Sequence, residues 1–170
     1  MDLKFCPACS TALQPAPAAH QPQTCAACGA AHYRNAKPCA GMVMERNGRV
    51  LLARRALEPH KGEWDLPGGF LQEDEHPEDG ARREIFEETG LRVRVLGLLG
   101  IYMDRYGSDE LAPWILNVYY HAEPLDDTEP QAADDVSELA WFAPDELPSQ
   151  MAFKHEHQVL ADWRARVAGS

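Results

Sequence analysis

The sequence predicts an α/β sandwich with a mixed order of strands and helices, preceded by a small zinc ribbon. Three observations predict it: apolar runs with the spacing of strands recur between residues 39 and 143, two segments carry helix signals, and two Cys-x2-Cys pairs stand near the start. Strands that outnumber two helices favour a sheet flanked by those helices. Acidic residues become frequent after residue 38, so we expect a ribbon over 1–36 and a main domain over 37–170.

The four cysteines of the N-terminal segment predict a structural zinc site. Cys6, Cys9, Cys25 and Cys28 follow the spacing C-x2-C, fifteen residues, C-x2-C, which is typical of four-thiolate ribbons. Two such turns can close a tetrahedron around Zn²⁺ in a segment too small to hold a core by itself. Disulfides fit less well without a secretory signal, and a rubredoxin-like iron centre stays open. His32, after the second pair, could replace a ligand or support the site.

The charge of the chain argues against nucleic acid as a partner. Its 170 residues carry 16 Lys and Arg against 27 Asp and Glu, a net charge of −11 at pH 7, which repels a phosphate backbone. An anionic substrate would need local help from basic side chains, helix N-termini or divalent cations. No apolar run is long enough for a membrane span, and residues 1–5 lack the pattern of a signal peptide, so we expect a cytoplasmic protein.

The elements of the main domain begin with a predicted hairpin. Residues 39–56 contain two apolar runs around Asn47-Gly48, a dipeptide that favours the type I′ turn of a tight hairpin. A third extended piece, residues 63–70, runs into a Pro-Gly-Gly loop. Cys39, the fifth cysteine, opens the first run and is expected to be a small buried hydrophobe.

The next predicted element is a helix over residues 77–89. Pro77 suits a first helical turn, the two acidic residues after it favour the positive end of the helix, and Gly90 is placed to end it. Three more strands and a closing helix follow from their apolar spacing. The strands cover 91–103, 112–123 and 137–143, and the helix covers 153–167.

Three glutamates share one face of the 77–89 helix. Glu84, Glu87 and Glu88 are related by steps of three and four residues, so their carboxylates lie on one side. Like charges so placed repel, and the face is mildly unfavourable unless a cation lies over it. Carboxylate oxygens are the ligands that Mg²⁺ and Mn²⁺ prefer. For three glutamates alone, a solvated acidic face is the alternative.

The residues around these glutamates complete a longer motif. Residues 69–91 satisfy G-x5-E-x7-R-E-U-x-E-E-x-G-U, where U is apolar, at every defining position. This stretch resembles the Nudix box of the Nudix hydrolases, and the resemblance extends to "GEWDLPGGF" before it and "AWF" after it. It implies an α/β/α Nudix sandwich whose box binds divalent cations. It also implies an enzyme that hydrolyses a nucleoside diphosphate linked to another moiety, giving a nucleoside monophosphate and the phosphorylated remainder.

The resemblance implies roles for the acids of the box. Glu87 and Glu88 would be ligands of Mg²⁺ or Mn²⁺, and Glu84 would be a further ligand or the base. Arg83 would orient this face, and Glu75 would contribute a contact behind the ligands. Metals held there would neutralise phosphate oxygens and acidify a bound water.

Residues flanking the helix are candidates for the rest of the site. Gly68 would belong to the metal site and Gly69 to the substrate site, because both allow a backbone approach that a side chain would block. Arg54, Arg55 and Lys61 stand between the hairpin and the box, where they could meet substrate phosphates or be surface charge.

The general base and the base-stacking aromatics are open choices. In this family the base is often an acid outside the box, and Asp134, Asp135 and Glu138 stand just before the "AWF" segment, where each could equally be solvated. Trp141 is expected in the core. Aromatics that could stack on a nucleobase, or lie in the core instead, are Trp64, Tyr102 and Trp114.

The ribbon narrows the expected substrates. A zinc ribbon joined to such a domain is similar to ribbon-bearing Nudix hydrolases associated with ADP-ribose and FAD pyrophosphatase activity. The NADH pyrophosphatases share the ribbon but carry a Ser-Gln-Pro-Trp-Pro-Phe-Pro-x-Ser motif that this sequence lacks. We therefore expect ADP-ribose or FAD first, NADH next, and nucleoside triphosphates and dinucleoside polyphosphates behind.

Two other classes of function stay open. A non-catalytic domain of this family could sense ADP-ribose, although this sequence keeps every acid of the box. The ribbon could bind RNA and direct the enzyme to capped RNA, but we expect it to stabilise the fold or a homodimer.

Overall fold

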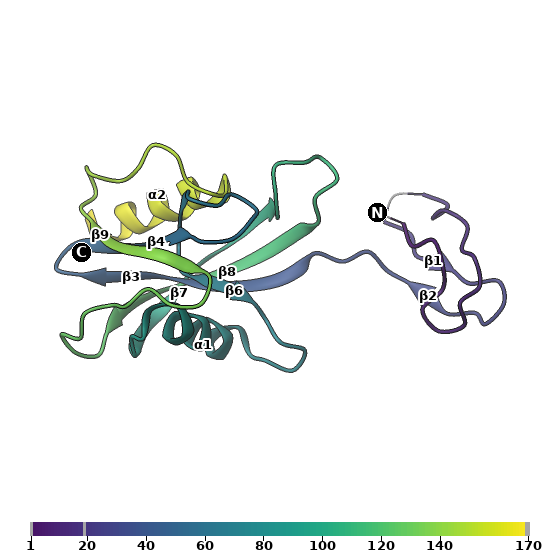
Figure 1. Ribbon diagram of the computed structural model, residues 1–170, viewed down its shortest axis with the longest axis horizontal. Helices are drawn as coiled ribbons and strands as arrows, with labels where there is room; N and C mark the ends of the chain where they lie inside the picture. Colours follow the sequence, from purple (N-terminus) through teal and green to yellow (C-terminus); the bar gives the residue numbers. More distant parts are fainter. Residues whose placement is uncertain (1, 19, 169–170) are drawn as a thin grey trace. The chain divides into compact units, whose positions relative to one another are not determined.

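The computed structural model describes residues 2–18 and 20–168, and the chain divides into two compact units, Met1–Ala36 and Lys37–Ser170 (Figure 1). The first unit contains a short antiparallel pair, β1 (Gln23–Thr24) and β2 (Ala31–His32), which the sequence did not predict. No helix among the described residues is long and apolar enough to cross a membrane.

Seven strands of the second unit form one mixed sheet. Its main path runs β5-β4-β3-β8-β7, with β6 paired to β3 and β9 paired to β4. β3 and β8 are parallel, and the other pairs are antiparallel. The sheet is therefore mixed, as predicted. The strands are β3 (Lys37–Arg46), β4 (Arg49–Arg55), β5 (Trp64–Asp65), β6 (Gly68–Phe70), β7 (Val93–Arg105), β8 (Trp114–Pro124) and β9 (Val136–Phe142).

Two helices, α1 (Pro77–Thr89) and α2 (His155–Ala168), cover opposite faces of this sheet (Figure 1). Alternate residues of β3 point to opposite faces, so one strand feeds two cores. Met42 and Met44 pack with Ile85 of α1. Val43, between them, packs with Trp163 of α2. The α/β/α sandwich is confirmed.

The predicted hairpin and the predicted first helix are both confirmed. Asn47 and Gly48 have φ values of 54° and 71°, as the type I′ turn requires. α1 has the predicted bounds, and it ends at Gly90 in the left-handed region with its N–H bonded to the Phe86 carbonyl. Its N-cap is His76, whose ring nitrogen accepts the Glu78 N–H, a capping role that the sequence did not indicate.

The other predicted elements differ at their ends by at most two residues, and the extended piece 63–70 forms two strands, β5 and β6. Trp141 is less buried than expected. Phe153 lies before α2 and not within it, although the predicted helix covers 153–167. Its N–H is bonded to the carboxylate of Glu156, a residue of the first turn of α2. Trp141 is half-buried, with the Arg46 guanidinium 4.9 Å from its ring centre, because β9 lies at the margin of the sheet. Cys39 is buried, as predicted.

The covering role of α2 predicts a large cost for truncating its central tryptophan. Trp163 is fully buried, and its indole N–H donates to Glu45. We expect Trp163→Ala to lower the free energy of unfolding by about 3–5 kcal/mol, because a cavity forms and the hydrogen bond to Glu45 is lost. Urea denaturation followed by circular dichroism measures this.

The matched control is Trp114→Ala, because the Trp114 side chain is 48% exposed. We expect it to cost less than about 1 kcal/mol. Equal losses in the two variants would contradict the packing of α2 against the sheet.

Candidate active site

A cavity of about 240 Å³ lies in the second unit. Its lining residues come from α1, from five strands of the sheet (β3, β4, β5, β6 and β8), from the segments that follow β7 and precede β9, and from the start of α2. Acidic, basic and aromatic side chains all reach it. Its lining comprises Cys39, Ala40, Arg55, Asp65, Leu66, Gly68, Gly69, Phe70, Glu84, Glu88, Tyr106, Ile115, Asn117, Tyr119, Asp134, Asp135, Phe153 and His155.

The three glutamates of α1 divide between this cavity and the surface. Glu84 and Glu88 line the cavity. Glu87 does not line it; its side chain is 46% exposed and is paired with Arg83 at 2.9 Å. Glu84 and Glu88 are four residues apart on the helix, so both carboxylates point into the cavity. Glu87, three residues after Glu84, lies outside the cavity lining.

Arg83 holds the acids of this helix in place. Its guanidinium donates to both carboxylate oxygens of Glu75 at 2.8 Å each. It also donates to Glu84 at 2.8 Å and to Glu87 at 2.9 Å. The hydrogen bonds from Arg83 lower the pKa of Glu75 to about 2. One cation therefore contacts three carboxylates, one in the loop before α1 and two in the helix.

The two glycines of β6 allow the close approach of backbone and acids. Gly68 has φ +155° and donates its N–H to Glu88 at 3.1 Å. A Cβ on Gly68 would lie 2.5 Å from the Cα of Gly41, and a Cβ on Gly69 would lie 2.5 Å from the carboxyl carbon of Glu84. Both distances are impossible, so larger residues at either position would displace the site.

Burial shapes the protonation of the cavity acids. Burial raises the pKa of Glu88 well above its ordinary value, and the negative charges of Asp135 and Asp65 raise it further. Burial also raises the pKa of Glu84, against the opposing effect of Arg83. The pKa of Asp135 is raised by burial as well, although Arg55 opposes the shift. A divalent cation in the cavity would favour the ionised form of all three acids.

The donor set fits a hydrated divalent cation. Glu84, Glu88 and Asp135 offer only oxygen ligands, which suits Mg²⁺ or Mn²⁺. Within the described residues, these acids do not form a set of three ligand atoms within 4.8 Å of one another. Such an ion would therefore take one or two carboxylates and complete its shell with water and substrate phosphate, as Mg²⁺ commonly does.

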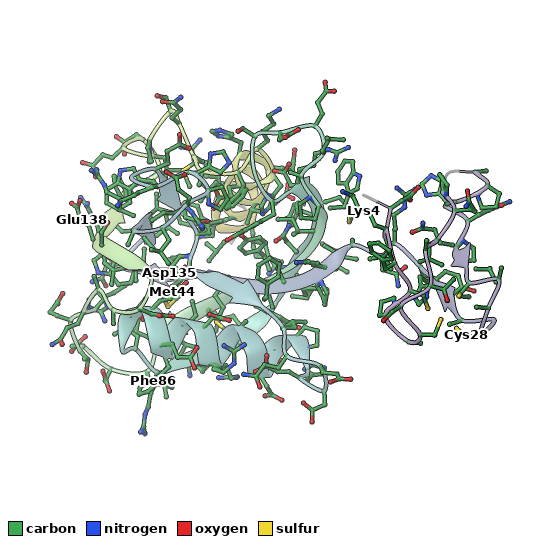
Figure 2. The ribbon with its side chains drawn as sticks, turned by 45° about the vertical axis from the view of Figure 1, so that its right-hand side comes forward. Lys4, Cys28, Met44, Phe86, Asp135 and Glu138 are labelled. Atoms are coloured by element: carbon green, nitrogen blue, oxygen red, sulfur yellow. The ribbon has the colours of Figure 1, made fainter. Side chains whose placement is uncertain are left out.

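The three candidate bases, Asp134 and Asp135 before β9 and Glu138 within it, lie in two environments. Asp134 and Asp135 line the cavity. Glu138 is outside it and is paired with Arg54 at 3.1 Å, with half of its side chain exposed. Figure 2 shows Asp135 between the two helices and Glu138 farther out along β9.

Of the three basic residues predicted to contact substrate phosphates, only one lines the cavity. Arg55 lines the cavity and is anchored there by Asp65 at 2.6 Å and by the Pro59 carbonyl at 2.7 Å. Arg54 stacks over Trp64, outside the cavity lining. Lys61 is exposed and also outside it.

Sequence reasoning missed most of the rings and polar groups of the cavity. The proposed stacking residues Trp64, Tyr102 and Trp114 do not line it. A signal existed for two others, because Asn117 and Tyr119 alternate along a predicted strand and so share a face. The other rings and charged groups that were missed had no local signal. They are Asp65, Phe70, Tyr106, Phe153 and His155.

The first unit brings its four cysteines together. The sulfurs of Cys6, Cys9, Cys25 and Cys28 all lie within 4.8 Å of one another, with two pairs at 3.6 and 3.7 Å. Sulfurs at the corners of a ZnS₄ tetrahedron are about 3.8 Å apart. The cluster therefore fits Zn²⁺. His32 lies beside it, with Nε2 3.3 Å from the Cys6 sulfur.

Comparison with known proteins gives a consistent likeness. The NUDIX domain pattern matches residues 36–163. A MutT-like protein of Streptomyces ambofaciens is 37% identical over 113 residues, 66% of this chain and 67% of that protein. An ADP-ribose pyrophosphatase of Methanocaldococcus jannaschii is 34% identical over 123 residues, 71% of this chain and 69% of that protein. Other relatives are named 8-oxo-dGTP diphosphatase and NAD-capped RNA hydrolase.

The solved structures agree with the sequence comparison. A NUDIX hydrolase from Nitrosomonas europaea superposes with a TM-score of 0.77 and 30% identity, covering 93% of this chain and 88% of that one. The superposition covers more of the chain than the NUDIX pattern does.

The buried carboxylate of Glu88 predicts a pH dependence of stability in the metal-free protein. Below about pH 4.3, Glu88 is protonated in the folded and the unfolded states. As the pH rises from there towards the raised pKa of the folded state, the unfolded chain ionises more readily and wild type loses stability. Glu88→Gln cannot ionise, so we expect it to be the more stable protein at pH 7 and to match wild type near pH 4.

Urea denaturation in EDTA across this pH range measures the difference. Glu87→Gln is the matched control, because that side chain is half-exposed and should gain no comparable pH-dependent advantage. A Glu88→Gln variant that is less stable than wild type at pH 7 would contradict the burial of an unpaired charge.

Proposed function

This chain belongs to the Nudix hydrolase family and is an enzyme of that family, and on this premise we propose that it cleaves the pyrophosphate bond of a nucleoside diphosphate linked to another moiety. ADP-ribose or FAD is the favoured substrate, with NADH next. The products are a nucleoside monophosphate and a phosphorylated remainder. The relative named ADP-ribose pyrophosphatase supports placing ADP-ribose first. The relatives named 8-oxo-dGTP diphosphatase and NAD-capped RNA hydrolase widen the range of substrates to be tested.

The observation that carries the proposal is the pair of inward carboxylates, Glu84 and Glu88, in one cavity with Asp135. Glu84 and Glu88 would hold Mg²⁺ or Mn²⁺, with Glu87 as a further ligand outside the cavity lining and the backbone of Gly68 completing the metal site. When bound, such ions would supply positive charge to the phosphate oxygens and acidify a water.

The remaining residues orient the acids and the substrate. Arg83 fixes the carboxylate of Glu84 through a 2.8 Å hydrogen bond. Arg55 faces the cavity with N–H groups that can reach a phosphate oxygen, and Gly69 lets the substrate approach the backbone. Arg54 and Lys61 would act only at the entrance. Of the candidate bases, Asp135 is favoured over Glu138 because Asp135 lines the cavity.

A product-release assay tests this function. With Mg²⁺ and separately with Mn²⁺, the panel is ADP-ribose, FAD, NADH, a dinucleoside polyphosphate and the nucleoside triphosphates. We expect turnover of the diphosphate-linked compounds and a loss of about 10³-fold or more in Glu88→Gln, because a charged metal ligand is removed. Asp135→Asn should lower turnover by about 100-fold and by more than Glu138→Gln.

Glu73→Gln is the control, since Glu73 is an exposed acid of the loop between β6 and α1 and does not line the cavity. A twofold loss in Glu88→Gln would mean that metals bind elsewhere. ADP-ribose bound without any turnover would instead assign the cavity to a sensor. Salt-sensitive RNA binding that disappears when residues 1–36 are deleted would favour the RNA-directed alternative.

The four-cysteine cluster is proposed to hold a structural Zn²⁺. Thiolates with this spacing and separation bind zinc tightly enough to drive the folding of a small segment. The fifth cysteine, Cys39, is in the second unit and provides a control.

We expect about one zinc per chain by elemental analysis, lost in Cys25→Ser and retained in Cys39→Ser. EDTA should destabilise the first unit without changing the fold of the second. Iron in place of zinc would favour the rubredoxin-like centre, and full zinc content in Cys25→Ser would contradict the site.

A further inference from the structure

One wall of the catalytic cavity is a continuous series of rings. Phe70, Tyr106, Phe153, His155 and Tyr119, here called the ring wall, all line the cavity. Each ring contacts the next, with centroid distances of 5.1, 5.7, 5.9 and 5.7 Å in that order. They come from β6, the residue after β7, the start of α2 with the segment just before it, and β8, so only the folded chain assembles them.

The ring wall is held in place by charged groups. Arg55 lies over Phe153 at 5.2 Å and over Tyr106 at 5.9 Å, and it donates to the Tyr106 hydroxyl at 3.4 Å. Asp65 anchors that guanidinium at 2.6 Å. At the other end, Asp104 accepts from the His155 backbone at 3.0 Å. A preformed wall of this kind loses little conformational entropy when a ligand binds.

The ring wall begins beside the metal-binding acids. Phe70 directly follows Gly69, whose Cα packs against the Glu84 carboxylate. Phe153 is only 7% exposed, whereas Phe70 is 37% exposed and Tyr106 is half-buried. A ligand therefore meets Phe70 and Tyr106 first, within reach of a phosphate held at the carboxylates.

Resting on the proposed function, we propose that the ring wall seats the nucleobase of the substrate and that Tyr106 makes the site favour purines over pyrimidines. Tyr106 and Phe153 are nearly parallel, at 19°, so a further planar ring that stacks on Tyr106 extends an existing stack. A purine covers more of that surface than a pyrimidine does. The stack depends on the ring of Tyr106 and not on its hydroxyl, which already accepts from Arg55.

The test compares the binding of AMP and UMP, which differ in the base alone. Titration calorimetry with Mg²⁺ present gives both dissociation constants without requiring turnover. Wild type should bind AMP roughly tenfold more tightly than UMP. Tyr106→Ala should weaken AMP by about tenfold and bring the two constants together, whereas Tyr106→Phe should keep the preference.

Two further variants keep the test independent of folding effects. Phe70→Leu removes a ring that is partly exposed, and it should weaken AMP more than UMP. Trp114→Leu removes an exposed aromatic outside the cavity lining and should keep the wild-type ratio. Thermal melts of each variant show whether it is folded.

Each outcome decides a separate point. An unchanged AMP-to-UMP ratio in Tyr106→Ala, a lost ratio in Tyr106→Phe, or no AMP binding to wild type overturns the ring-wall proposal. A base-selective ratio in a protein that hydrolyses nothing in the substrate panel supports the ring wall while the proposed hydrolysis fails. Turnover of ADP-ribose together with an unchanged AMP-to-UMP ratio in Tyr106→Ala supports the proposed hydrolysis and overturns the ring-wall proposal.

Discussion

The burial of the Glu88 carboxylate is the constraint on which the rest of the cavity depends. The side chain is 5% exposed, and it accepts one hydrogen bond, from the Gly68 N–H. That bond requires β6 to run against β3 so closely that Gly68 and Gly41 are register partners without side chains. Helix, strand and loop thus meet around a group whose charge is costly until a cation accompanies it.

The acidic composition of the chain is consistent with a reaction that depends on divalent cations. A net charge of −11 would repel a pyrophosphate, and five of the acids line the cavity: Asp65, Glu84, Glu88, Asp134 and Asp135. Arg83 is paired with Glu75 and Glu84, and Arg55 is anchored to Asp65. Divalent cations are therefore the remaining source of positive charge large enough to bring substrate and acids together.

Local signals account for what the sequence predicted. The ends of α1 follow from Pro77 and Gly90, and the box motif identified its acids. Whether Glu87 or Glu88 faces the cavity depends on which side of the helix the sheet covers, so spacing alone could not decide it. The ring wall could not be predicted because Tyr106 and Phe153 are 47 positions apart and meet only after α2 packs against the sheet.

The most direct test of a metal-binding cavity built on buried acids is the release of protons when Mn²⁺ binds. Calorimetric titrations at pH 6.5 in two buffers with different ionisation enthalpies give the number of protons released per ion. We expect wild type to release protons, because the pKa values of Glu84 and Glu88 are raised in the folded protein and must fall when the ion binds. Glu88→Gln should bind Mn²⁺ more weakly and release fewer protons. Equal Mn²⁺ affinity and equal proton release in the two proteins would contradict a metal site at Glu88.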